Sequence, residues 1–211
     1  GEVVEVGGGV TDVTVGDHVV FQFRSSCGRC RRCLEGRPAL CEVAAKSKSN
    51  GELMSGGKRL SLDGEPISHH SGISCMAEYA VVDRGTIVIV DKSLPLDEAA
   101  LFGCAVMTGV GAVTNTARVR PGDIVAIVGL GGVGLNALLG AVLGGAERII
   151  AIDVSDDKLG LARQLGATDT FNATDADCAA QVIELTKGGV DFAIETAGAI
   201  KAMETCYSIL R

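Results

Sequence analysis

The sequence lacks any apolar run long enough to cross a membrane as a helix. Such a helix needs about 18 consecutive apolar residues or more, and glycines and charged residues interrupt every candidate run. The sequence also lacks an excess of positive charge, because 19 Lys and Arg stand against 26 Asp and Glu, a net charge of −7. Nucleic acids and anionic membranes attract basic surfaces. We therefore expect neither of them as a partner.

A secretory signal peptide is also missing. The chain opens with GEVVEVG rather than Met and closes with AMETCYSILR, which reads as the inside of a helix. We therefore expect an internal piece of a longer protein. Eight cysteines among 211 residues are too few and too clustered for the disulfide framework of a secreted domain. This cysteine usage favours a reducing compartment, and we expect the cytoplasm.

Short β-type runs dominate the first hundred residues. The stretches GEVVEVG, HVVFQF, AEYAVV and TIVIV are rich in β-branched residues, and turn signals such as VGD and DRG separate them. Residues 42–74 are polar. We expect a long surface loop there, with one hairpin.

Strands and helices alternate in the second half of the chain. The stretch LDEAALFGCAVMTGVGAV has helical spacing. The pattern after it predicts strands over 124–129, 148–153, 169–172 and 190–195, and helices over 132–145, 156–165, 176–187 and from 199 onward. Apolar strands that alternate with amphipathic helices predict an α/β fold with a parallel sheet.

Four of the eight cysteines fall within 15 residues, in the pattern Cys27-x2-Cys30-x2-Cys33-x7-Cys41. Thiolates at this spacing converge readily on a tetrahedral zinc ion, and a structural zinc site is closed by four protein ligands. A closed site has no open coordination position, so it supports structure rather than chemistry. Three arginines lie among the ligands and are placed to offset the negative charge of a zinc tetrathiolate: Arg29, Arg31 and Arg32.

Other interpretations of the cysteine cluster are weaker. An iron–sulfur run of the ferredoxin type also begins C-x2-C-x2-C, but it closes after three residues and is followed by Pro. Here the last gap is seven residues, and Glu42 follows Cys41. A zinc ribbon that grips nucleic acid is disfavoured by the acidic chain. We expect the remaining cysteines, Cys75, Cys178 and Cys206, to be small core residues.

A glycine-rich turn follows the strand IVAIVG. The turn reads G-L-G-G-V-G and spans Gly129, Gly131, Gly132, Val133 and Gly134. It lies between a predicted strand and a predicted helix, which is the context that the dinucleotide-binding motif requires. The helix N-terminus offers free N–H groups to a pyrophosphate.

The next predicted strand ends at an acidic residue, Asp153. A carboxylate there would bind the adenosine ribose hydroxyls and repel a 2′-phosphate, so NAD is favoured over NADP. Lys158, one turn into the next helix, is within reach of the same ribose or is a plain surface residue.

These motifs together resemble the zinc-dependent medium-chain alcohol dehydrogenases, the class I and class III enzymes above all. The resemblance rests on GEVVEVG, GDHVV, the cysteine spacing, AEYAVV, LFGCAVMTGVGAV, RPGD, GLGGVG, AID and LGATD, in this order. It implies a truncated, mostly β GroES-like catalytic domain over 1–105, with the zinc lobe over 25–42. It also implies a truncated Rossmann-type NAD-binding domain with a doubly wound sheet over 106–211.

The resemblance gives roles to four further residues. Cys104 matches a ligand of the catalytic zinc, and Thr108 matches a residue near the nicotinamide. Val133 would press on the nicotinamide ring, and Phe23 would line the substrate pocket. The family's other catalytic zinc ligands, a cysteine and a histidine, are not found among these residues, so we expect this piece to be inactive by itself.

The implied activity is transfer of hydride from a primary or secondary alcohol, including S-hydroxymethylglutathione, to NAD⁺. Two alternatives remain. One is a polyol or threonine dehydrogenase with the same cofactors. The other is a non-catalytic, zinc-stapled NAD-binding scaffold in which Cys104 is only a core residue. The resemblance implies a homodimer or homotetramer for the whole protein, acting on a small alcohol or aldehyde.

Overall fold

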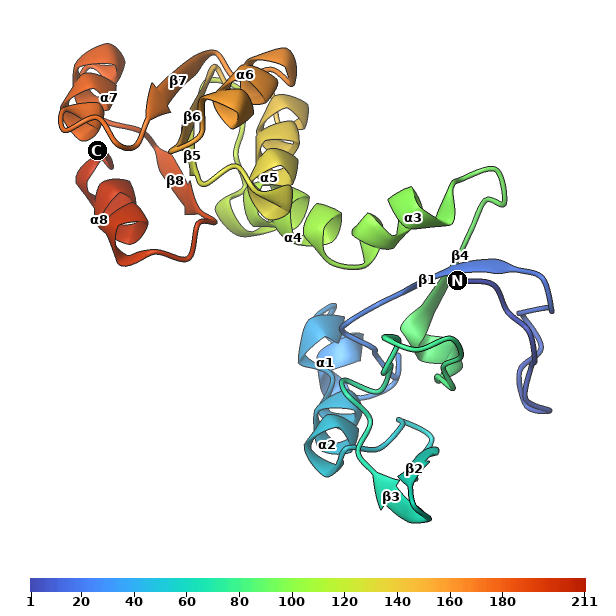
Figure 1. The fold of residues 1–211 in the computed structure, drawn as a ribbon. Coiled ribbons are helices and arrows are strands. Elements are labelled where there is room, and N and C mark those ends of the chain that lie inside the picture. The colour runs from blue at the N-terminus through green and yellow to red at the C-terminus, as the bar shows by residue number, and fades with distance from the viewer. The chain divides into compact units, whose positions relative to one another are not determined.

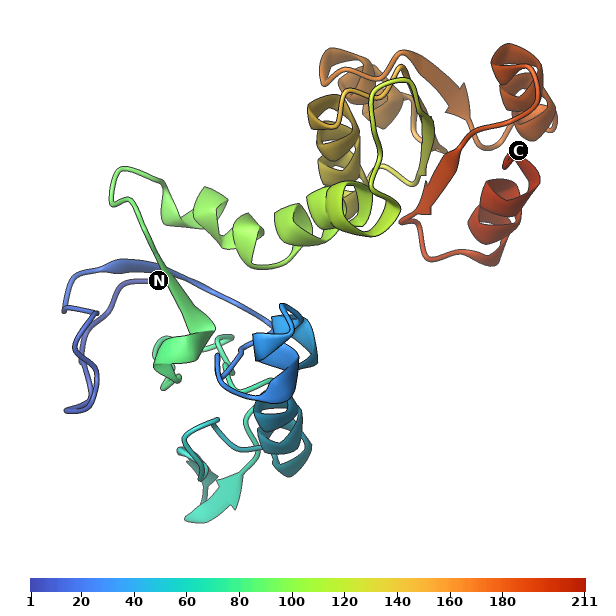
Figure 2. The same ribbon diagram turned by 180° about the vertical axis from the view of Figure 1, so that it is seen from behind.

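The computed structural model describes all residues 1–211, and the chain divides into two units. Unit 1 is Gly1–Cys104 and unit 2 is Ala105–Arg211. Figure 1 shows the helices and strands of each unit, and Figure 2 shows them from behind. The two units are described separately below.

Unit 2 contains a four-stranded parallel sheet. Its strands are β5 (Ile124–Val128), β6 (Arg148–Asp153), β7 (Asp169–Asn172) and β8 (Phe192–Glu195), in the order β7-β6-β5-β8. The strand order changes direction between β5 and β8, so the sheet is doubly wound, as predicted. The helices between the strands are α5 (Gly132–Leu143), α6 (Asp156–Gln164), α7 (Cys178–Thr186) and α8 (Ile200–Ser208).

Alternate residues of β5 feed two separate cores, one on each face of the sheet. Val125 and Ile127 pack with residues of α5 and α6. Ala126 and Val128 pack with residues of α7 and α8. Successive side chains of a strand point to opposite faces, and both faces of a parallel sheet are covered by helices. This arrangement explains why β5 is apolar along its whole length.

The stretch with helical spacing before the sheet is helical but not continuous. It begins in unit 1 with α3 (Leu96–Ala99) and the 3-10 helix η3 (Ala100–Gly103). Unit 2 opens with α4 (Ala105–Gly111) and the π-helical segment η4 (Ala112–Ala117). No single helix of the chain is long and apolar enough to cross a membrane. One bent pair of helical segments reaches that length and composition when its members are taken together, Leu96–Gly103 and Ala105–Ala117.

Unit 1 has little regular sheet. Strands β1 (His18–Phe21) and β4 (Ile87–Val90) pair antiparallel, with His18 opposite Val90. A small core of Val13, Val19 and Ile87 lies beside them. The expected hairpin is β2 (Leu60–Leu62) with β3 (Glu65–Ile67).

Four expectations for unit 1 are wrong. The stretch AEYAVV forms no strand. The stretch GEVVEVG lies beside the start of β1 but contributes only an isolated bridge between Glu2 and His18. The expected loop over 42–74 begins instead with the helix α2 (Glu42–Asn50). Cys75 is exposed rather than a core residue, whereas Cys178 and Cys206 are buried as expected.

Candidate functional site

The four clustered cysteines converge in space. Their Sγ atoms all lie within 4.8 Å of one another, with 3.5 Å between Cys30 and Cys33 and 3.9 Å between Cys30 and Cys41. Four sulfur atoms that bind one zinc ion at about 2.3 Å in a tetrahedron lie about 3.8 Å apart. The observed spacing therefore fits a zinc ion held by Cys27, Cys30, Cys33 and Cys41.

Local backbone geometry brings the sulfur atoms together. Cys27 and Cys30 lie on either side of a tight turn, in which the Cys30 N–H points at the Cys27 sulfur at 3.3 Å. Cys33 follows in α1 (Arg31–Leu34), and Cys41 begins α2 after the 3-10 helix η1 (Pro38–Leu40). The Cys41 sulfur accepts N–H groups from Cys27 and Ala44, at 3.3 and 3.4 Å. These donors stabilise thiolates.

The pKa values of two thiols in the cluster are shifted in opposite directions from the ordinary value. Hydrogen bonding from the backbone of Cys33, and next from that of Glu42, lowers the pKa of Cys30 to about 6. Burial, with a contribution from the Cys30 side chain, raises the pKa of Cys33 to about 11. A bound zinc ion would favour the thiolate form of all four cysteines, because a cation stabilises the deprotonated form of a coordinating thiol.

Two of the four arginines in the lobe already have carboxylate partners. Arg31 is 2.7 Å from Glu35, and Arg32 is 3.2 Å from the same carboxylate. Arg32 also lies 3.9 Å from Glu42. Their positive charge is therefore at least partly offset by these acidic side chains.

The glycine-rich turn joins β5 to α5. Gly129 has a φ of +93°, a left-handed conformation that favours glycine, and a Cβ there would lie 2.6 Å from the Ala197 nitrogen. A Cβ on Gly134 would lie 1.8 Å from the Gly129 oxygen. The fold itself therefore requires these two glycines.

Gly131 differs from these two glycines, because a Cβ on it would meet nothing within 4 Å. Gly131 is exposed and is the N-cap of α5. The space around Gly131 is therefore open at the start of the helix, where free N–H groups would bind a pyrophosphate. The turn therefore fits a dinucleotide, with Gly132 and Val133 forming the first residues of the helix.

Asp153 ends β6 and its carboxylate reaches back to this turn. The Asp153 Oδ2 atom accepts the Leu130 N–H at 2.6 Å, and Oδ1 accepts the Ser155 N–H at 3.0 Å. Asp153 is only 7% exposed. Lys158 lies 3.7 Å from the Asp153 carboxylate, which places an ammonium group beside the predicted ribose position.

A hollow of about 260 Å³ opens beside Asp153 at the carboxyl ends of the strands. It is lined by residues that follow β5, β6, β7 and β8, among them Gly129, Val154, Thr174, Ala197 and Lys201. The crevice at the switch in strand order is where open α/β sheets bind their ligands. Gly129 and Asp153 were predicted from the sequence, and the other four residues were not.

Two further residues of the turn region were missed by the sequence analysis. The Thr196 hydroxyl donates to the Gly129 oxygen at 2.6 Å and so fixes the turn. Gly109 of α4 packs against α5, because a Cβ on it would lie 2.3 Å from the Val133 oxygen. A glycine one residue after Thr108 was the only signal in the sequence for this close contact. Thr108 itself is exposed on α4.

Cys104 ends unit 1 and is exposed, as is Phe23. Gly103 packs against β1, where a Cβ would lie 2.4 Å from the Phe21 oxygen. This contact brings the segment of Cys104 to the strand that leads into Phe23. Cys104 does not belong to a cluster of three or more metal-ligating side chains, because the four-cysteine cluster is the only one in the chain.

Two family models match the chain. The model described as alcohol dehydrogenase GroES-like domain matches residues 1–92, and the model described as zinc-binding dehydrogenase matches residues 132–211. Among curated relatives, an S-(hydroxymethyl)glutathione dehydrogenase of Synechocystis is 42% identical over 207 residues, which are 97% of this chain and 56% of the relative. The protein of the same name from Photobacterium damsela is 41% identical with the same coverage.

Solved structures agree with these matches. An alcohol dehydrogenase zinc-binding domain protein from Burkholderia ambifaria is similar over the whole chain, with a TM-score of 0.87 and 35% identity. Benzyl alcohol dehydrogenase from Acinetobacter calcoaceticus has a TM-score of 0.82 and 35% identity. This chain covers 57% of each of these two structures, so it spans little more than half the length of the proteins that it matches. The chain belongs to the zinc-dependent medium-chain alcohol dehydrogenase family.

Proposed function

We propose that the protein is a zinc-dependent oxidoreductase that transfers hydride from a primary or secondary alcohol to NAD⁺. The observation that carries the proposal is the presence in one chain of the four-cysteine cluster and of the glycine-rich turn bound to Asp153. The products would be a carbonyl compound, NADH and a proton. Zinc acts as a Lewis acid towards oxygen, and nicotinamide is a hydride acceptor.

The residues of unit 2 would bind and orient the cofactor. The free N–H groups at the start of α5 would hold the pyrophosphate in front of Gly131. The Asp153 carboxylate would accept hydrogen bonds from the ribose hydroxyls, and its negative charge would disfavour the 2′-phosphate of NADP. Val154, Ala197 and Lys201 line the adjoining hollow and would contact the adenosine half of the cofactor.

The residues of unit 1 would supply structure and part of the reaction site. Cys27, Cys30, Cys33 and Cys41 would hold a structural zinc ion. Cys104 would offer a thiolate to a catalytic zinc ion, and Phe23 would line the substrate pocket. A catalytic zinc site takes three protein ligands, and Cys104 lies in no such cluster here. We therefore also propose that residues 1–211 alone turn over substrate poorly.

Relatives suggest two substrates to test. The curated relatives are named for S-(hydroxymethyl)glutathione, and one structural relative is named for benzyl alcohol. A polyol or threonine dehydrogenase would share the same cofactor residues. We also propose a homodimer or homotetramer in the cytoplasm for the whole protein, which light scattering and fractionation would test.

The decisive experiment measures zinc per chain and NADH formation in the full-length protein and in its Cys104→Ser variant. Two zinc ions per chain that fall to about one, together with loss of NADH formation from both alcohols, would support the proposal. One zinc ion in both proteins, with no NADH formed, would overturn it and favour a zinc-stapled NAD-binding scaffold.

A further inference from the structure

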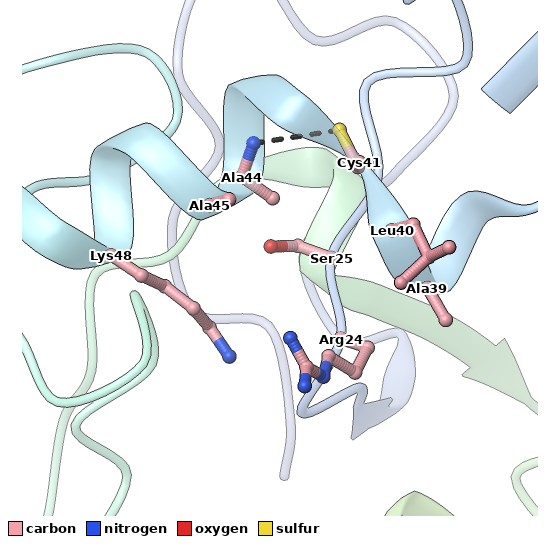
Figure 3. A pocket seen from close by; sticks show the side chains of 8 residues that line it. All are labelled: Arg24, Ser25, Ala39, Leu40, Cys41, Ala44, Ala45 and Lys48. Atoms are coloured by element: carbon pink, nitrogen blue, oxygen red, sulfur yellow. Dashed lines mark hydrogen bonds between the residues drawn. The ribbon is translucent and has the colours of Figure 1, made fainter. Parts of the chain in front are cut away.

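A second hollow, of about 170 Å³, lies in unit 1 beside the cysteine cluster. It is formed by α2, by the 3-10 helix η1 and by the segment that precedes the first ligand cysteine. Its polar lining consists of Arg24, Ser25 and Lys48, and Leu40 and Ala44 contribute apolar walls. Figure 3 shows the Lys48 ammonium and the Arg24 guanidinium turned towards each other, with the Ser25 hydroxyl directed into the same space.

Lys48 is held in place from one side. Its Nζ atom donates to the Phe23 carbonyl oxygen at 3.0 Å and lies 4.1 Å from the centre of the Phe23 ring. An ammonium group has three N–H donors, so two remain for another partner. The side chain is thereby positioned before any ligand arrives, which lowers the entropic cost of binding.

Neither cation of this hollow has an acidic partner. All the ion pairs of unit 1 involve other residues, and no carboxylate lies within 4.0 Å of Arg24 or Lys48. Two positive groups that face each other without a counter-charge repel. Burial is the main cause that lowers the pKa of Lys48, and the charge of Arg24 adds to it.

We propose that this hollow binds a small oxyanion, a carboxylate or a phosphate group, between Arg24 and Lys48. The planar fork of arginine matches both groups, and ammonium and hydroxyl donors complete their coordination. Ser25 is only 5% exposed, so its hydroxyl is a fixed part of the wall rather than a mobile surface group. The anion-binding groups of Arg24, Ser25 and Lys48 are not among the residues assigned to zinc, NAD or the alcohol, although Cys41 lines the hollow and Phe23 positions Lys48.

The competing explanation is that both cations only offset the charge of a zinc tetrathiolate, since Cys41 also lines the hollow. The two explanations differ in what they predict. If the two cations only offset the charge of the cluster, the protein should bind no free anion, and removing either cation should weaken zinc binding. If the hollow is an oxyanion site, the protein should bind phosphate or acetate saturably, and removing either cation should leave the zinc ion bound.

The test is calorimetric titration of the zinc-loaded protein with inorganic phosphate and, separately, with acetate, against sodium chloride at equal ionic strength. We expect saturable binding with a Kd on the order of 1 mM. Lys48→Met and Arg24→Met should each weaken it at least about tenfold. Lys46→Met is the matched control, because Lys46 is exposed on the same helix and does not line the hollow.

The zinc content and melting temperature of each variant complete the experiment. Tighter binding of acetate would identify a carboxylate ligand, tighter binding of phosphate a phosphoryl ligand, and equal binding a general oxyanion site. Absence of saturable binding to the wild-type protein would overturn the proposal. So would unchanged binding in Lys48→Met and Arg24→Met, or zinc loss in both variants without any anion effect.

Discussion

Asp153 and Leu130 are joined by a hydrogen bond of 2.6 Å, from the Leu130 N–H to the Asp153 Oδ2 atom. This bond ties the end of β6 to the turn that follows β5, and both residues are almost fully buried. The carboxylate therefore has two tasks. It holds the glycine-rich turn in shape, and we propose that its remaining acceptor capacity binds a ribose.

Asp153→Ala should lower both stability and dinucleotide affinity. The buried Leu130 N–H loses its acceptor, which costs about 1–3 kcal/mol of unfolding free energy. Urea denaturation followed by circular dichroism measures that loss, and NADH fluorescence measures binding. Asp153→Asn is the matched control, because its amide oxygen restores an acceptor for Leu130 without the charge. A variant Asp153→Ala as stable as the wild type would contradict the structural role.

Gly131→Ala and Gly134→Ala should separate binding from folding. A Cβ on Gly134 would lie 1.8 Å from the Gly129 oxygen, so the turn must move and unit 2 loses about 1–3 kcal/mol or more. A Cβ on Gly131 meets no protein atom within 4 Å, and its φ of −75° suits alanine. The unfolding free energy of the Gly131→Ala variant should therefore stay within about 1 kcal/mol of that of the wild type.

NADH affinity distinguishes the two glycine variants further. The Gly131→Ala methyl group would occupy the space in front of the α5 N-terminus and weaken NADH binding in a fully folded protein. The measurement is a fluorescence titration of both variants beside their melting temperatures. Unchanged NADH affinity in Gly131→Ala would show that the pyrophosphate does not lie there.

The second half of the chain was predictable because its periodicity and its turns agree. Strand β6 was predicted to the residue, and β7 lies where a strand was expected. The parallel sheet followed from the alternation of strands and helices, and its doubly wound order followed from the family resemblance. The four-cysteine cluster was predictable from spacing alone. The lining of the hollow near Asp153 was not, because Val154, Thr174 and Lys201 meet only through the order of the strands.

Helix α2 shows why unit 1 was harder to predict. A helix N-cap is normally recognised by Ser, Thr, Asp or Asn, whereas here the Cys41 sulfur accepts the Ala44 N–H. The helix buries only Ala44 and Ser47, so it lacks the apolar stripe that marks an amphipathic helix. The cysteine that was predicted as a zinc ligand is therefore also the cap of this helix, and the capping role was not predicted.

Cys41→Ser should empty the structural zinc site and unfold the lobe around it. Between residues 25 and 42 only Ser25 and Cys41 are buried, so the lobe has almost no apolar core of its own. Metal binding then supplies much of its folding free energy. Zinc per chain should fall by about one, and the amides of α1 should exchange hydrogen rapidly while those of β5 stay protected.

Cys75→Ser is the control for the zinc site, because Cys75 is an exposed cysteine outside the cluster. It should keep the zinc content and the exchange pattern of the wild type. Removal of zinc with a chelator should reproduce the effect of Cys41→Ser. Equal zinc content in Cys41→Ser and the wild type would contradict the four-cysteine site.

The buried thiol of Cys206 should make the unfolding free energy of unit 2 fall as the pH rises above about 9. Burial in the core between the sheet and α8 raises the pKa of this thiol from 9.0 to about 11, with the nearby Glu195 charge adding to the effect. Below about pH 9 the thiol is protonated in the folded and unfolded states, and its contribution to stability is complete. Between about pH 9 and pH 11 only the unfolded state releases the proton, so stability falls by up to about 1.4 kcal/mol per pH unit.

The comparison that isolates this effect uses Cys206→Ala. Other groups also titrate at alkaline pH, so the measured quantity is the difference in unfolding free energy between wild type and variant, from about pH 7 to about pH 10. The smaller alanine leaves a cavity that lowers the free energy of unfolding by the same amount at every pH. The thiol instead makes the free energy of unfolding of the wild type fall as the pH rises. We expect the variant's disadvantage to shrink as the pH rises above about 9. Cys75→Ala should keep the wild-type slope, and parallel curves for wild type and Cys206→Ala would show that the buried thiol does not govern the alkaline transition.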